Sequence, residues 1–168
     1  MERIEWIEKY LADAERLIYE GELENGLNVL DKLLYEEPGY GSLHNHIGWA
    51  HLYHTRNTAK SERHLKLAIT FDDEFAHAYL HLGCLYIRLA RYSEAIGYLK
   101  IGLTKVNANK LAILQNMAHA YEMLGKFSEA IKAYREAMIV STAEYEIDQL
   151  QAGIKRCRKK RVVLFFTL

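Results

Sequence analysis

Proline is almost absent from this sequence of 168 residues, which contains one Pro and two Cys. Because helix interiors reject proline, its scarcity favours helices over a loop-rich all-β fold. Two cysteines cannot build a framework of disulfides, so the expected location is a reducing cytoplasm. No apolar run approaches the roughly 20 residues of a membrane-spanning helix. The first residues also lack the apolar core of a secretory signal, so none is expected.

The sequence also lacks net charge, with 22 basic and 22 acidic residues. Dedicated nucleic-acid-binding proteins are strongly basic, so nucleic acid is not an expected partner. Half of the residues are hydrophobic, which excludes wholesale disorder and suffices for a buried core. The charge is unevenly distributed: residues 1–40 contain eleven acidic and four basic residues, whereas residues 145–168 contain two acidic and six basic ones. The amino-terminal end is therefore acidic and the carboxyl-terminal end basic.

A pattern of small, aromatic and aliphatic residues recurs about every 35 residues. Leu82-Gly83-x-x-Tyr86 with Tyr92-x-x-Ala95 returns as Met117-Ala118-x-x-Tyr121 with Phe127-x-x-Ala130, and Ile47-Gly48-x-x-His51 stands one period earlier. These residues resemble the tetratricopeptide repeat, a helix–turn–helix unit of about 34 residues. The resemblance covers four repeats, approximately residues 7–40, 41–75, 76–110 and 111–144.

The resemblance implies an all-α fold, a right-handed superhelical solenoid of about four tetratricopeptide helix pairs. We expect a single domain over residues 1–161, closed by a capping helix at about 145–160 and followed by an apolar tail, 162–168. Small residues are expected where paired helices cross: Ala14, Gly26, Gly48, Gly83, Ala95, Ala118 and Ala130.

The turns between paired helices carry their own signals. Gly21 and Gly125 are expected to end helices in the left-handed conformation. The second repeat lacks this glycine; there we expect Asn57 to be left-handed and Thr58 to cap the next helix.

In the family, the first helix of each repeat lines a concave groove, and the resemblance implies a set of groove residues here. They are Asn45, His46, Trp49, Tyr53, His77, His81, Cys84, Arg88, Gln115, Asn116 and His119, with Leu11, Glu15, Ile18, Tyr19, Leu52, Leu80 and Glu122 at further groove positions. Trp, Tyr and Arg dominate binding hot spots, so Trp49, Tyr53 and Arg88 are the predicted anchors for a partner. Asn45, Gln115 and Asn116 are predicted to bind the backbone of an extended peptide. The alternative is that Trp49 and Tyr53 only pack against neighbouring helices.

Histidines are abundant in this groove, whereas the Lys/Asn/Arg pattern with which some members of the family bind a terminal carboxylate is absent. His77, His81 and Cys84 share a helix face at spacings suited to zinc ligands, but tight Cys/His pairs are missing, so neither a metal nor any other cofactor is predicted. No catalytic motif occurs, and an enzyme is not expected; a dyad of Cys84 with His81 or His119 is the catalytic alternative. The remaining histidines divide into expected core residues (His44, His51) and expected solvent-facing ones (His54, His64).

Residues 155–161 hold six basic side chains and precede the almost wholly apolar residues 162–168. Three interpretations stay open for this segment. It contacts an anionic membrane surface through residues 155–168, it adds a strand to a partner or to another copy of the chain in self-association, or it folds back or frays.

The sequence thus predicts a non-catalytic interaction module, a scaffold or adaptor of bacterial type. Its expected partner is a protein or peptide, bound as a peptide or helix in the concave groove. The alternatives are a secretion-type chaperone for an apolar client and a membrane-surface accessory protein anchored by its basic and apolar tail.

Overall fold

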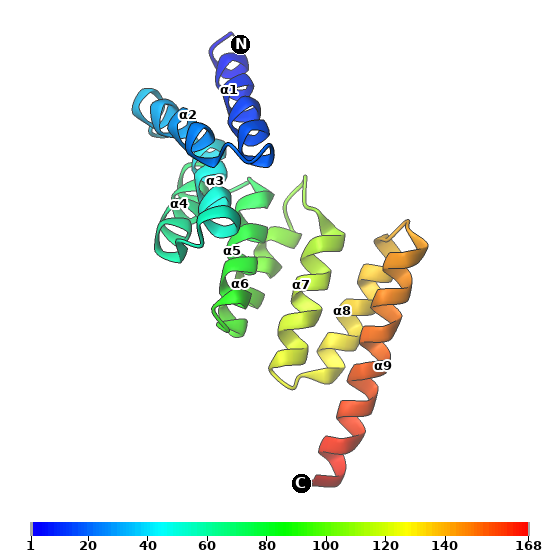
Figure 1. Ribbon diagram of the computed structural model, residues 1–168. Coiled ribbons are helices and arrows are strands. Elements are labelled where there is room, and N and C mark those ends of the chain that lie inside the picture. The colour runs from blue at the N-terminus through cyan, green and yellow to red at the C-terminus, as the bar shows by residue number, and fades with distance from the viewer. Residues whose placement is uncertain (1, 168) are drawn as a thin grey trace. The chain divides into compact units, whose positions relative to one another are not determined.

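The computed structural model describes residues 2–167, with side chains for residues 3–163, and every regular element within this range is helical (Figure 1). The elements are α1 (Glu2–Tyr19), α2 (Leu23–Glu36), α3 (Gly41–Ala50), the π-helical turn η1 (His51–Thr55), α4 (Thr58–Phe71), α5 (Ala76–Arg88), α6 (Tyr92–Leu103), α7 (Lys110–Met123), α8 (Phe127–Val140) and α9 (Glu144–Thr167). The chain divides within α5 into two compact units, Met1–His81 and Leu82–Leu168, which we call the N-unit and the C-unit. The single domain expected from the sequence stays a prediction.

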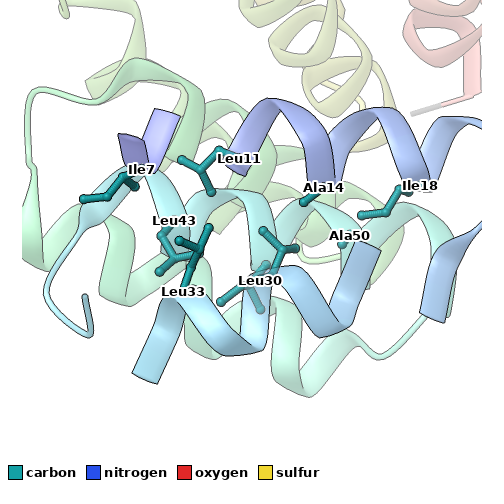
Figure 2. Packing of buried hydrophobic residues seen from close by; sticks show 9 residues of the cluster. Ile7, Leu11, Ala14, Ile18, Leu30, Leu33, Leu43 and Ala50 are labelled. Carbon is teal, nitrogen blue, oxygen red and sulfur yellow. The ribbon is translucent and has the colours of Figure 1, made fainter. Parts of the chain in front are cut away.

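The core of the N-unit lies where α1, α2 and α3 meet. Figure 2 shows its apolar side chains converging between these helices. They come from α1 (Ile7, Leu11, Ala14, Ile18), α2 (Leu30, Leu33) and α3 (Leu43, Ile47, Ala50), and none is more than 3% exposed. Burying a Leu or Ile side chain contributes about 1.5–3 kcal/mol, so this cluster holds the first helix pair against the second.

Small residues occupy the helix crossings, as the repeat pattern predicts. A Cβ on Gly26 would lie 2.5 Å from Ile18 Cγ1 and 2.9 Å from the Ala14 carbonyl oxygen. A Cβ on Gly48 would lie 2.6 Å from Leu65 Cγ. Any side chain at these positions would push the paired helices apart, which confirms the expected close approach.

Two turns follow the prediction and one does not. Gly21 and Gly125 have φ values of +89° and +71°, so both end helices in the left-handed region as expected. The predictions for Asn57 and Thr58 were wrong: Arg56 is left-handed, with φ 57°, and Asn57 rather than Thr58 caps α4, because its side chain accepts a hydrogen bond from Lys60 N at 3.1 Å. An N-cap residue cannot itself take the left-handed conformation, so that role falls on the residue before it.

In the C-unit, α7 packs on α8 and α8 on α9. The capping helix was expected to end near residue 160, but α9 continues to Thr167. Its 24 residues span about 36 Å, against about 21 Å for the 14 of α8, so its carboxyl end projects beyond α8 (Figure 1). The tail through residue 167 is therefore helical, not a strand, because no Gly or Pro follows Gly153 to stop the helix; Leu168 lies outside the described residues. Among the described residues, none of the helices combines the length and the apolar character of a membrane span.

Candidate functional site

A groove of about 410 Å³ lies in the N-unit between α1, α3 and the start of α5. We call it the N-unit groove. Its lining residues are Glu8, Glu15, Tyr19, Ser42, Asn45, His46, Trp49, Phe75, His77 and His81. Seven of the predicted groove residues thus lie together in one cavity: Glu15, Tyr19, Asn45, His46, Trp49, His77 and His81.

The innermost polar pair of the groove is His81 and Asn45. Asn45 is 5% exposed, and its Oδ1 accepts a hydrogen bond from His81 Nδ1 at 2.9 Å. Burial lowers the pKa of His81 to about 4, and the neighbouring His77 and His46 add to this shift. His81 is therefore neutral at neutral pH, and because Nδ1 donates, Nε2 is left as an acceptor.

The rim of the groove carries carboxylates beside histidines. His46 Nδ1 donates to the Ser42 carbonyl oxygen at 2.8 Å, and its Nε2 lies 3.9 Å from Glu15 Oε2. Glu8 accepts a hydrogen bond from the Tyr40 hydroxyl. Burial, followed by this bond to Glu8, raises the pKa of Tyr40 to about 12. Two carboxylates thus face a groove that no Lys or Arg of the described chain lines.

Aromatic rings also line the groove. Trp49 is half-buried, and its ring centroid lies 5.4 Å from that of Tyr19 and 5.0 Å from that of His54. Trp49 packs against the N-unit core and also lines the groove, so it combines the two roles weighed from the sequence. Tyr53 is not a lining residue, but its ring stands edge-on to His81 at 6.0 Å.

The observed lining of the groove differs in part from the prediction. Four further groove positions are instead core: Leu11, Ile18, Leu52 and Leu80 are at most 9% exposed. An apolar side chain on these helices gains more by packing between helices than by facing water. Glu8, Ser42 and Phe75 were missed; Glu8 stands seven residues before Glu15 and Ser42 four before His46, so helical spacing alone could have found those two.

In the C-unit the structure places the remaining predicted groove residues on α5 and α7. Cys84, Gln115 and Asn116 are half-buried, whereas Arg88 and His119 are exposed. The Asn116 amide donates to the Ala112 carbonyl oxygen of its own helix at 2.8 Å, which occupies one of its donors. Their role in binding stays a prediction.

Among the described residues, no three His, Cys, Asp or Glu side chains lie close enough together to hold a metal ion. The alternative of a zinc site at His77, His81 and Cys84 therefore finds no support in the geometry.

Glu122 was placed in the groove by sequence, but α9 occupies its surroundings. Its side chain is 4% exposed and accepts from Arg156 Nε and Lys160 Nζ, each at 2.7 Å, and from the Tyr134 hydroxyl at 3.2 Å. The Arg156 bond, then that of Lys160, lowers the pKa of Glu122 to about 2 despite its burial. This carboxylate therefore fastens the capping helix to α7 and α8 rather than facing a ligand.

A histidine pair that joins α3 to α4 was not predicted from the sequence. His64 was expected to face solvent, but its Nδ1 lies 3.0 Å from Nδ1 of His44. His44 Nε2 donates to the Pro38 carbonyl oxygen at 2.9 Å, so His44 Nδ1 accepts and His64 Nδ1 donates. Burial, with the nearby His44 next in effect, lowers the pKa of His64 to about 4. His44 and His51 are buried and His54 is exposed, as predicted.

The comparisons with known proteins agree on the type of repeat. Two profiles of the tetratricopeptide repeat match, over residues 78–109 and 111–149. The crystal structure of MamA protein superimposes with a TM-score of 0.78 at 16% identity, covering 92% of this chain and 82% of that one. A thermophilic TPR protein of Thermus thermophilus gives 0.73 at 18% identity, covering 88% and 81%. MamA 41-end from Desulfovibrio magneticus RS-1 gives 0.72 at 13%, covering 95% and 93%. No curated protein sequence matches significantly.

Proposed function

Since the chain is a tetratricopeptide repeat protein with an all-α helical-repeat solenoid, we propose that it binds a partner protein. The family is generally a non-enzymatic interaction scaffold. The proposed ligand is a cationic, extended peptide of the partner, bound in the N-unit groove. The observation that carries this proposal is the lining of the groove: carboxylates of Glu8 and Glu15 beside the rings of Tyr19 and Trp49.

The size of the groove suits a short extended segment. Glu8 and Tyr19 line it from opposite parts of α1, and that stretch of helix rises about 16 Å. An extended peptide advances about 3.3 Å per residue, so roughly five residues fit along it. Asn45 of α3 and His81 of α5 also line the groove, and the acceptor nitrogen Nε2 of His81 suits a peptide N–H group.

The charge of the groove determines which peptide side chains it favours. Two carboxylates and no lining Lys or Arg favour a Lys or Arg of the peptide, and the faces of Trp49 and Tyr19 add cation–π attraction. Acidic peptides would meet like charge. A uniformly apolar client would cover the Glu15 carboxylate and remove its water without offering it a partner, which costs free energy.

Selection of displayed short random peptides on the full chain tests the proposal. The expected result is enrichment of Lys or Arg in the bound peptides, loss of binding in Trp49→Ala, and loss of the cationic preference in Glu15→Lys. Glu24→Lys, an equal change at an exposed residue of α2 outside the groove, is the matched control and should select as the wild type does.

Two results would overturn the proposal. Enrichment of acidic peptides, or enrichment that Trp49→Ala leaves unchanged while the variant keeps its helical circular dichroism, would exclude the groove as the binding site. Selection of uniformly apolar peptides would instead support the chaperone function. Arg88→Ala, in the C-unit, measures whether the predicted anchor there contributes to the same binding.

A further inference from the structure

A second and larger groove lies on the side of the N-unit formed by α1 and α2. Its volume is about 780 Å³, and we call it the N-end groove. Trp6 and Tyr10 of α1 line it with ring centroids 5.0 Å apart. Tyr35 of α2 lines it as well and is 86% exposed. Three large aromatic side chains are therefore left in water at the first helix pair.

Trp6 and Tyr10 stand four residues apart on α1, so their rings share one helix face. Trp6 is 42% exposed and Tyr10 is 41% exposed. Contiguous exposed apolar surface of this kind marks an interaction site.

The N-end groove is also acidic. Asp31 and Glu36 line it against one basic residue, Lys32. The surrounding residues 1–40 contain eleven acidic and four basic side chains. A complementary surface must therefore combine positive charge with some apolar area.

The outer face of α9 has this chemistry. Lys155, Arg158 and Val162 follow one another at spacings of three and four residues, so they share one helix face, and all three are exposed. The opposite face is fixed to the C-unit, because Arg156 and Lys160 bind the buried Glu122. The orientation of α9 is thus set by its ion pairs, and they turn Lys155 and Arg158 outward.

The surface beside this face of α9 is hollowed as well. A groove of about 780 Å³ between α8 and α9 is lined by three basic residues, Arg135, Lys155 and Arg158, and by one acidic residue, Asp148. The first helix pair and the last two helices therefore each carry an open groove, of similar volume and opposite charge.

We propose that the outer face of α9, with Lys155, Arg158 and Val162, docks in the N-end groove of a second copy of this chain. The carboxylates of Asp31 and Glu36 receive the basic side chains, and the rings of Trp6 and Tyr10 receive the aliphatic stems and Val162. The contact is heterologous, so a dimer keeps one free groove and one free α9 face and further copies add to it. This assembly does not depend on the peptide proposed for the N-unit groove.

A membrane surface is the competing occupant of α9. A helix that lies in a lipid interface needs an apolar stripe along its length, with charges confined to the other face. On α9 the described residues from 155 to 161 carry charges on both faces, those of Arg156 and Lys160 being bound to Glu122. The acidic aromatic groove complements this face more closely than lipid does.

Charge exchange between copies tests the docking. Lys155→Glu/Arg158→Glu makes the α9 face acidic, and Asp31→Lys/Glu36→Lys makes the N-end groove basic. We expect the wild type to associate in sedimentation velocity with a mass that rises with concentration and falls with added salt. Each double variant alone should associate at least roughly tenfold more weakly, because like charges then face each other. An equimolar mixture of the two double variants should associate again, since each altered surface meets its complement.

Two controls separate docking from general effects. Lys100→Glu/Lys126→Glu makes the same charge change at exposed residues of the C-unit outside α9 and should associate as the wild type does. Trp6→Ala/Tyr10→Ala keeps every charge but removes the rings, and should abolish association while its thermal unfolding stays close to that of the wild type.

The proposal is overturned by a wild type that stays monomeric at all concentrations, which includes the case of an intramolecular contact. It is also overturned if the mixture of double variants fails to associate although both are folded. Sedimentation with vesicles of phosphatidylserine and phosphatidylcholine supplies the membrane arm: binding lost in Lys155→Glu/Arg158→Glu, with self-association unchanged, would assign the α9 face to lipid instead.

Discussion

The two units are built from the same repeat but differ in their turns and in the role of their buried polar residues. In the C-unit the turn between α7 and α8 is closed by Gly125, and the repeat profiles match residues 78–109 and 111–149, most of this unit. In the N-unit the turn between α3 and α4 has no glycine, begins with η1 and places Arg56 in the left-handed region. The N-unit contains the His-rich groove, whereas in the C-unit the buried carboxylate of Glu122 binds α9 through Arg156. A left-handed residue other than glycine also occurs in the C-unit, at Ala90 between α5 and α6, so the feature peculiar to the N-unit among the described residues is the π-helical turn η1.

The largest expected effect concerns the helix crossings of the two units. At Gly48 an added Cβ would lie 2.6 Å from Leu65 Cγ and 3.2 Å from Leu65 N, so both side chain and backbone obstruct it. At Gly83 the three atoms nearest to the added Cβ all belong to the Leu99 side chain, the closest at 2.5 Å. Gly48→Ala should therefore cost about 2–3 kcal/mol in urea-induced unfolding and Gly83→Ala about 1–2 kcal/mol, since a side chain can repack and a backbone cannot.

Two further variants sharpen this comparison. A Cβ added to Gly97, an exposed residue of α6, would meet no atom within 4 Å, so Gly97→Ala should stabilise the protein by about 0.5–1 kcal/mol through helix propensity alone. Leu99 is fully buried, so Leu99→Ala is itself destabilising, but its cost should be smaller in the Gly83→Ala background than in the wild type, because the added Cβ fills part of the space. Equal losses at Gly48 and Gly83 would contradict the distinction between the two crossings.

The second largest expected effect is that lowering the pH destabilises the two units in a fixed order. For His64 the pKa falls from 6.5 in the unfolded chain to about 4 in the fold, so the unfolded state takes up the proton first and stability declines as pH falls from 6.5 to 4. Glu122 has its pKa lowered from 4.5 to about 2, so its contribution is complete above pH 4.5 and is lost only as pH falls toward 2. The N-unit should therefore loosen before the C-unit; partial exposure of the His64 ring reduces the effect to about 1–2 kcal/mol.

Amide hydrogen exchange at pH 7 and pH 4.5, corrected for the intrinsic rates, measures this order. Protection should fall in α3 and α4 but persist in α7 to α9. His64→Gln should flatten the pH dependence of the N-unit between 6.5 and 4, while Glu122→Gln should lower protection of α9 already at pH 7. Simultaneous loss of protection in both units would refute the separate roles of the two buried clusters.

The regular parts of the molecule could be predicted from sequence because each depends on local chemistry. Gly21 and Gly125 indicate left-handed turns, and Gly48 and Gly83 indicate close crossings, whatever lies elsewhere in the chain. The recurrence of these signals established the helix pairs and their order.

The remaining features depend on which helices meet. The pairing of His44 with His64 joins side chains 20 residues apart, and Glu122 finds Arg156 across 34 residues. Neither pairing has a motif, because long-range partners are chosen by packing. The groove residues could be predicted only in part. Asn45, His46 and Trp49 followed from the repeat register. Leu52 did not, because it is buried within η1, where the wider π-helical winding departs from the α-helical register.

The smallest expected effect tests the two turns directly. A left-handed residue with a Cβ costs about 1 kcal/mol relative to glycine, so Arg56→Gly should stabilise the protein by roughly 0.5–1 kcal/mol and Gly125→Ala should destabilise it by about 1 kcal/mol. Thermal unfolding of both variants measures the opposite signs. Asn57→Ala is the accompanying control: it removes the bond to Lys60 N but leaves Arg56 in place, and should cost about 1 kcal/mol through the lost cap. If Arg56→Gly were destabilising, the Arg56 side chain would hold the turn by contacts of its own, and the turn of the N-unit would be a built feature rather than a tolerated departure from the repeat.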